Sequence, residues 1–98
     1  MNIAKTVNGS ELLMALSGSL DTMTAPTLEK AVDESLGGVT KLIFDFAKLE
    51  YVSSAGLRIL LRCHKIMAKQ GSMVVRNVNK DVMDIFEVTG FSSILTIE

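Results

Sequence analysis

The 98-residue sequence is poor in several residue types, with one cysteine, one proline, no tryptophan and only 5% aromatic residues. The single cysteine, Cys63, excludes an internal disulfide, and because small secreted domains often need disulfides, a reducing compartment is expected. No apolar run approaches the ~20 residues of a membrane span, and the first residues lack the basic and apolar regions of a signal peptide. We therefore expect a cytoplasmic protein without direct membrane insertion.

The sequence also lacks a charge excess, since ten Lys and Arg residues face eleven Asp and Glu residues. Nucleic-acid binding is not expected, because it needs a clustered basic surface. One histidine, His64, and one cysteine cannot make a common zinc site. No glycine-rich phosphate loop or nucleophile elbow is present, and no nucleophile–base pair can be assembled. The expectation is a protein that is not an enzyme and has no cofactor and no metal.

Hydrophobic residues make up 48% of the chain and fall in short runs, which predicts one domain over residues 1–98. Asn8-Gly9 predicts a hairpin turn. The expected order is β-β-α-β-α-β-α-β, an α/β fold whose mixed sheet has an N-terminal hairpin, then parallel crossovers, packed with about three helices. We expect strands at 2–7, 12–16 (buried on both faces), 41–46, 73–75 and 94–97, helices from the Thr24 cap to Leu36 and over 55–70 and 80–89, and loops at 18–21 and 45–54.

Ser53 and Ser54 stand at the start of the helix expected from Ala55. Serine hydroxyls there can accept hydrogen bonds from unpaired backbone N–H groups of the first turn. A phosphate would also be favoured, because it would face the positive end of the helix dipole. A serine pair in this place is most often a cap alone, so the structural and the regulatory interpretation both stay open on local physics.

The same helix carries a basic stripe at spacings of four, three and four, formed by Arg58, Arg62, Lys65 and Lys69. Such a stripe is most often a solvated helix face. The functional alternative is a docking surface for an acidic partner, with Leu61 as an apolar contact. Asp21 follows a predicted strand, and loops after successive parallel strands gather at one sheet edge. This would place Asp21 near Ser54, although a loop carboxylate can simply bond nearby backbone.

The chain resembles the STAS domain family, and within it the single-domain bacterial anti-sigma factor antagonists. The resemblance rests on four segments in the same order, with similar intervals over nearly the whole chain. The most specific is the serine–Gly–Leu segment that opens a helix. The segments are Gly18-Ser19-Leu20-Asp21, Ile43-Phe44-Asp45-Phe46, Val52-Ser53-Ser54-Ala55-Gly56-Leu57-Arg58 and Phe86-Glu87-Val88-Thr89-Gly90-Phe91.

The resemblance implies a partner switch. The unphosphorylated antagonist binds an anti-sigma factor that is also a serine kinase, and this frees a sigma factor. Phosphorylation separates the complex, and a PP2C-type phosphatase restores it. The family's acceptor serine matches Ser54, and its acidic residue after the second strand matches Asp21. Many members have Asp where this chain has Ser53, so Ser53 remains an alternative acceptor.

Partner-binding residues expected from the stripe and the resemblance together are Asp21, Ser53, Ser54, Gly56, Arg58, Leu61, Arg62 and Lys65. A second functional hypothesis assumes the same fold but a different function. In it the domain is a STAS adaptor subunit of a transporter or of another signalling complex, and it is not phosphorylated.

Overall fold

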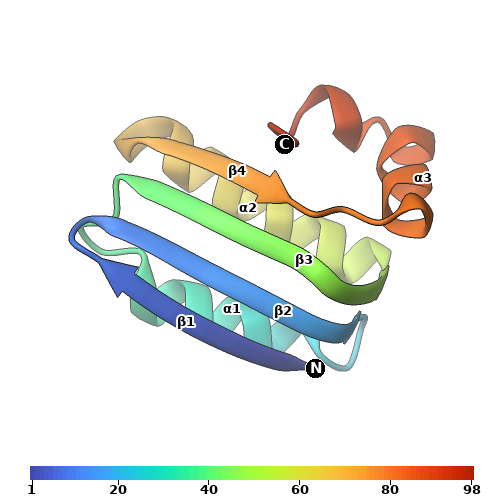
Figure 1. Ribbon diagram of the computed structural model, residues 1–98, viewed down its shortest axis with the longest axis horizontal. Coiled ribbons are helices and arrows are strands. Elements are labelled where there is room, and N and C mark those ends of the chain that lie inside the picture. The colour runs from blue at the N-terminus through green and yellow to red at the C-terminus, as the bar shows by residue number, and fades with distance from the viewer.

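The computed structural model describes all 98 residues as a four-stranded sheet with three α-helices (Figure 1). The strands lie in the order β1-β2-β3-β4; β1 pairs antiparallel with β2, and the other pairs are parallel. The predicted mixed sheet, with its N-terminal hairpin and its crossovers, is confirmed. The elements are β1 (Asn2–Asn8), β2 (Glu11–Leu20), α1 (Ala25–Ser35), β3 (Lys41–Val52), α2 (Ser54–Gln70), β4 (Ser72–Arg76), α3 (Lys80–Thr89) and the 3₁₀ turn η1 (Phe91–Ser93).

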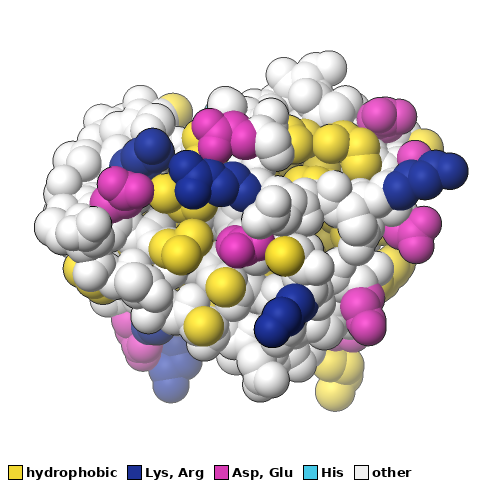
Figure 2. Space-filling model, in the orientation of Figure 1, with side chains coloured by type: hydrophobic (Ala, Val, Ile, Leu, Met, Phe, Trp, Pro, Cys, Tyr) yellow, Lys and Arg dark blue, Asp and Glu magenta, His cyan; other side chains and the backbone are white.

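Helices α1 and α2 cover one face of the sheet, and α3 lies beyond the end of β4 (Figure 1). Along β2 the buried residues therefore alternate, with Leu12, Met14 and Leu16 buried and Leu13 and Ala15 half-buried. The expectation that this strand is buried on both faces is wrong, because no helix covers the second face. Figure 2 shows that face, where hydrophobic side chains are scattered between charged ones.

Strand β3 is twice as long as expected, and the expected loop over 45–54 is wrong for most of its length. Its inward residues Phe46, Leu49 and Val52 are spaced by three instead of two. Two register shifts against β2 explain the spacing, since each places one extra β3 residue opposite β2. The expected loop at 18–21 is also wrong for most of its length. Strand β2 continues through these residues, because it pairs with β3 as far as Leu20.

Helix boundaries follow the predicted signals closely. Helix α3 has the expected bounds, with Asn79 as its N-cap and Gly90 in the left-handed region at its end. Helix α2 begins at Ser54, one residue before the expected start, and ends before Gly71. The final strand expected at 94–97 is reduced to a single bridge between Ile97 and Val75.

The core lies between the sheet and the helices. Phe46 packs against Phe44 and against Phe86 of α3, with ring centroids 5.8 and 6.4 Å apart. The contact with Phe86 anchors α3 to the end of the sheet where the loops after β2, β3 and β4 gather (Figure 1). No helix of the structure combines the length and the apolar character that crossing a bilayer requires.

Candidate functional site

The start of α2 is held to the end of β2 by backbone contacts. The Ser53 N–H donates to the Leu20 carbonyl at 2.8 Å, and the Ser53 carbonyl accepts from the Leu57 N–H at 2.9 Å. Ser53 is thus the residue through which β3 turns into α2. The adjacent end of β2 leads directly to Asp21, so Asp21 follows the residue that is bonded to Ser53; the predicted proximity of Asp21 and Ser54 stays a prediction.

The two serines have different surroundings. Ser53 is half-buried, has extended backbone geometry, and its Oγ accepts a hydrogen bond from the Gly56 N–H at 3.3 Å. Ser54 is the first helical residue, and it is exposed. The cap function therefore belongs to Ser53, and the Ser54 hydroxyl stands at the solvent side of the helix start, next to unpaired N–H groups of the first turn.

Gly56 is buried and lets α2 approach β2 closely. A Cβ atom at this position would lie 2.6 Å from Cγ of Leu20 and 3.0 Å from the Leu20 carbonyl oxygen. Such distances are shorter than packed atoms tolerate. Gly56 therefore shapes the site from beneath and offers little surface to a partner.

Asp21 folds the turn between β2 and α1. Its Oδ1 accepts hydrogen bonds from the backbone N–H groups of Met23 at 2.9 Å and Thr24 at 3.0 Å. These bonds favour the carboxylate, and the Thr24 N–H is the main reason that the pKa of Asp21 lies below its ordinary value. Thr24 is the N-cap residue of α1 as expected, but its hydroxyl donates to the Ser19 carbonyl at 2.8 Å and gives the helix no side-chain cap.

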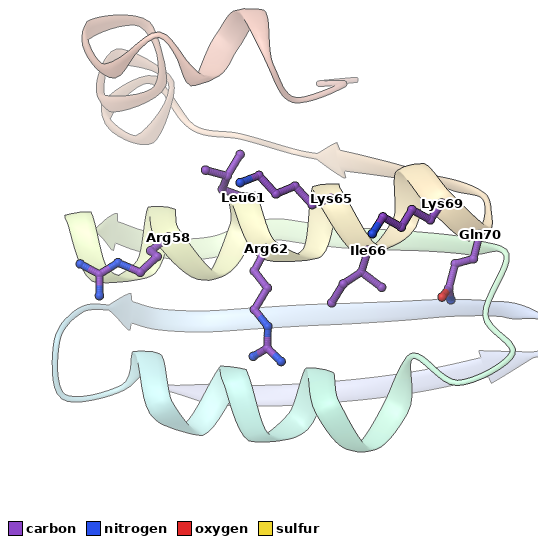
Figure 3. Close-up of a pocket in the computed structure, with 7 residues that line it drawn as sticks. All are labelled: Arg58, Leu61, Arg62, Lys65, Ile66, Lys69 and Gln70. Atoms are coloured by element: carbon purple, nitrogen blue, oxygen red, sulfur yellow. The ribbon is translucent and has the colours of Figure 1, made fainter.

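The basic stripe of α2 borders a shallow groove of about 410 Å³ (Figure 3). Arg62 reaches toward α1, where its guanidinium pairs with Glu29 at 3.1 Å and Asp33 at 2.6 Å. Part of its charge is therefore balanced within the chain. The positive charge along the stripe is therefore less uniform than the sequence indicates. The groove is lined by Arg58, Leu61, Arg62, Lys65, Ile66, Lys69 and Gln70.

Leu61, which flanks the basic stripe, is half-buried. The remaining reactive side chains of α2 are Cys63 and His64. Cys63 is completely buried, and this burial raises the pKa of its thiol to about 12. His64 is half-buried. No three His, Cys, Asp or Glu side chains converge in the way a metal ion needs.

Two exposed apolar residues near the serines were not predicted as site residues. Met23, in the turn after β2, is 86% exposed, and Tyr51, near the end of β3, is 49% exposed. The sequence predicts a loop at Tyr51, and the exposure of a loop residue does not indicate a site. Met23 is one of six methionines, a residue type that usually fills gaps in hydrophobic cores. The one signal in the sequence for an exposed Met23 is its position between Asp21 and Thr24, in the turn after β2.

Comparison with known proteins gives a consistent result. The STAS domain family model matches residues 2–98. BtrV of Bordetella bronchiseptica, whose name assigns it as an anti-sigma factor antagonist, is 32% identical over 88 residues, which are 88% of this chain and 76% of BtrV. The anti-sigma-B factor antagonist of Bacillus subtilis is 27% identical over 99 residues, covering 99% of this chain and 90% of that protein.

Solved structures show the same fold. An anti-sigma factor antagonist from Mycobacterium paratuberculosis superposes with a TM-score of 0.88 at 22% identity, covering 98% of this chain and 83% of that one. The anti-sigma factor antagonist SpoIIAA in its unphosphorylated form gives 0.76 at 18% identity, covering 99% and 87%. With the family model matching nearly every residue and relatives named anti-sigma factor antagonists, this chain belongs to the STAS domain family.

Proposed function

We propose that this STAS domain is an anti-sigma factor antagonist, and that phosphorylation of Ser54 switches it off. In the unphosphorylated form it binds an anti-sigma factor that is also a serine kinase, and so releases a sigma factor. The observation that carries the proposal is the exposed hydroxyl of Ser54 at the first position of α2, beside a cap that Ser53 already provides.

The phosphoryl transfer needs only an accessible hydroxyl from this chain. The Ser54 Oγ attacks the γ-phosphorus of ATP held by the kinase, the bond to the leaving ADP breaks, and the hydroxyl proton passes to a base of the kinase. A PP2C-type phosphatase would reverse the modification, with water attacking the phosphorus and the serine oxygen leaving. This domain contributes no catalytic group to either step.

The phosphate would change binding more than folding. It adds a charge of about −1.5 to −2 at a helix N-terminus, where the dipole and free N–H groups favour it. The domain can therefore remain folded while the partner is excluded by bulk and by repulsion from acidic groups. Loss of one to three kcal/mol at an interface weakens binding by roughly five- to 150-fold.

The proposed partner surface runs from the serine end along α2. Arg58 and Lys65 are exposed and not ion-paired within the chain, so they can steer an acidic partner surface. Asp21 flanks the serines, and Gly56 allows the close approach of β2 and α2 that brings them together. The proposed partner-binding residues are Asp21, Ser53, Ser54, Arg58, Leu61, Arg62 and Lys65, and the buried Gly56 contributes by shaping the site.

The test is a capture experiment from the source cell with wild type, Ser54→Ala, Ser54→Asp and Ser53→Ala as baits. Captured kinase-like protein is identified by mass spectrometry, purified, and incubated with each bait and ATP-Mg²⁺. We expect wild type and Ser54→Ala to bind it, Ser54→Asp to lose it, and phosphate to map to Ser54. Phosphate on Ser53, or capture of the same transporter components by every bait without any phosphate, would overturn the proposal; the second outcome would favour the adaptor role.

A further inference from the structure

The turn between β2 and α1 presents an apolar side chain three residues after Leu20, whose carbonyl accepts the N–H of Ser53 next to the proposed phosphorylation site. One oxygen of Asp21, Oδ1, holds the N–H groups of Met23 and Thr24. The Asp21 N–H in turn donates to the Thr24 hydroxyl at 2.8 Å. These bonds fix the chain on both sides of Met23, and the Met23 side chain is left 86% exposed.

Five large apolar side chains of the molecule are exposed, and two of them stand in segments that are joined to the start of α2. Met23 lies three residues after Leu20, whose carbonyl accepts the Ser53 N–H. Tyr51 precedes Ser54 by three residues. Tyr51 pairs with Ser19 across the sheet, so it too is fixed by backbone pairing. The other three, at positions Val7, Val88 and Ile94, lie on β1, on α3 and after η1.

We infer that Met23 and Tyr51 form the apolar contact of this domain with its anti-sigma factor, and that Asp21 serves this contact through the turn it folds. The inference rests on the proposed function, because that function places a partner at Ser54. Methionine suits such a contact because its side chain adapts to irregular surfaces. Tyrosine offers a large apolar ring with a polar end, and it is enriched at protein interfaces.

The charges around the two residues favour a protein partner over a lipid surface. In the sequence, Glu50 adjoins Tyr51 and Asp21 precedes Met23 by two residues, and both carry carboxylates that an anionic membrane would repel. Arg58, one turn into α2, supplies a cation on the same side of the serines. An apolar pair edged by charges of both signs matches a protein interface with an apolar centre and a polar rim.

Binding of the purified anti-sigma factor to Met23→Ser and Tyr51→Ser tests the apolar contact. Val7→Ser is the matched control, because Val7 is 71% exposed and pairs with Leu12, eight residues along β2 from Leu20. That separation is about 26 Å at ~3.3 Å per residue. We expect Met23→Ser and Tyr51→Ser each to weaken the affinity about ten-fold or more, while Val7→Ser leaves it unchanged, with all variants unfolding at similar urea concentrations.

Two substitutions separate the turn from the charge at Asp21. Asn can still accept both N–H bonds through its amide oxygen, whereas Ala cannot. We expect Asp21→Asn to keep the affinity within about three-fold and Asp21→Ala to weaken it as much as Met23→Ser does. Equal losses for Asn and Ala would show that the charge itself meets the partner, and would overturn the role of the turn.

The remaining outcomes keep this inference apart from the proposed function. If Ser54→Asp abolishes binding and Met23→Ser and Tyr51→Ser do not weaken it, the switch stands and the apolar contact is wrong. If Met23→Ser changes self-association measured by light scattering and leaves the anti-sigma factor affinity unchanged, the occupant is a second copy and the inference is wrong. If the wild type binds no anti-sigma factor, both proposals fail.

Discussion

Substitutions at the two adjacent serines should change the free energy of unfolding in opposite directions. The Ser53 hydroxyl accepts the Gly56 N–H, so Ser53→Ala removes the N-cap of a 17-residue helix. Loss of such a cap costs about 1 kcal/mol. For a domain of this size, that lowers the melting temperature by roughly 4–8 °C. Ser54 occupies the first helical position, where alanine is the better helix former, so Ser54→Ala should be neutral or stabilising by a few tenths of a kcal/mol.

Ser54→Asp imitates the charge of the phosphate and should stabilise the isolated domain. A carboxylate in the first turn gains about 0.3–1 kcal/mol from the helix dipole at low ionic strength. Raising the salt concentration to about 1 M shortens the screening length to about 3 Å and should remove most of that gain. The loss in Ser53→Ala arises from a neutral hydrogen bond, and it should persist in high salt.

Urea unfolding at pH 7 measures these differences, provided that the dependence on urea is the same for every variant. The reasoning is refuted if Ser54→Ala loses about 1 kcal/mol and Ser53→Ala loses nothing. Ser54 would then be the cap, and its hydroxyl would not be free for a kinase. Destabilisation by Ser54→Asp would refute the dipole argument and would mean that the phosphate disturbs the fold as well as the partner.

Three further outcomes are expected. Gly56→Ala should destabilise the domain by about 1 kcal/mol in urea unfolding, because an overpacking cost of roughly 1–3 kcal/mol exceeds the helix-propensity gain of about 1 kcal/mol; Gly37→Ala, where no atom lies within 4 Å of the new Cβ, is the control and should be nearly neutral. The pKa of Asp21 is lowered in the folded state, so its contribution to stability is present above the ordinary value of 3.8 and is lost as the pH falls through the lowered folded value; unfolding curves of Asp21→Asn should show a smaller loss of stability on acidification than those of the wild type. The Cys63 thiol, buried and with its pKa raised to about 12, should react with Ellman's reagent at pH 8 only after denaturant unfolds the chain; rapid labelling of the native protein would contradict this.

The helices could be predicted from the sequence because their ends are marked by local chemistry. Asn79 and Gly90 delimit α3, and Gly71 ends α2, so the expected bounds lie within one residue of the observed ones. The outer half of β3 could not be predicted, since two bulges change its inward spacing from two residues to three. The inward residues Phe46, Leu49 and Val52 therefore show no strand periodicity in the sequence.

The position of the candidate site could be predicted from topology, whereas the roles of its residues could not. That the end of β2, which leads to Asp21, lies next to Ser53 follows from the parallel pairing of β2 and β3. That Arg62 is paired with Glu29 and Asp33 depends on how α1 packs beside α2, which no spacing within α2 reveals. The exposure of Met23 likewise depends on hydrogen bonds made by its neighbours.

A serine at a helix start can serve as an N-cap or as a phosphorylation site, and the two functions conflict when one residue must perform both. A cap must hold its hydroxyl toward the backbone, and a kinase substrate must present its hydroxyl to another protein. In the proposed switch the two tasks fall to adjacent positions, with Ser53 bonded to the Gly56 N–H and Ser54 exposed. Because the cap does not pass through the modified oxygen, adding or removing a phosphate on Ser54 leaves the helix start intact. The free energy of the modification can then act on partner affinity instead of on folding, which is what a reversible switch requires.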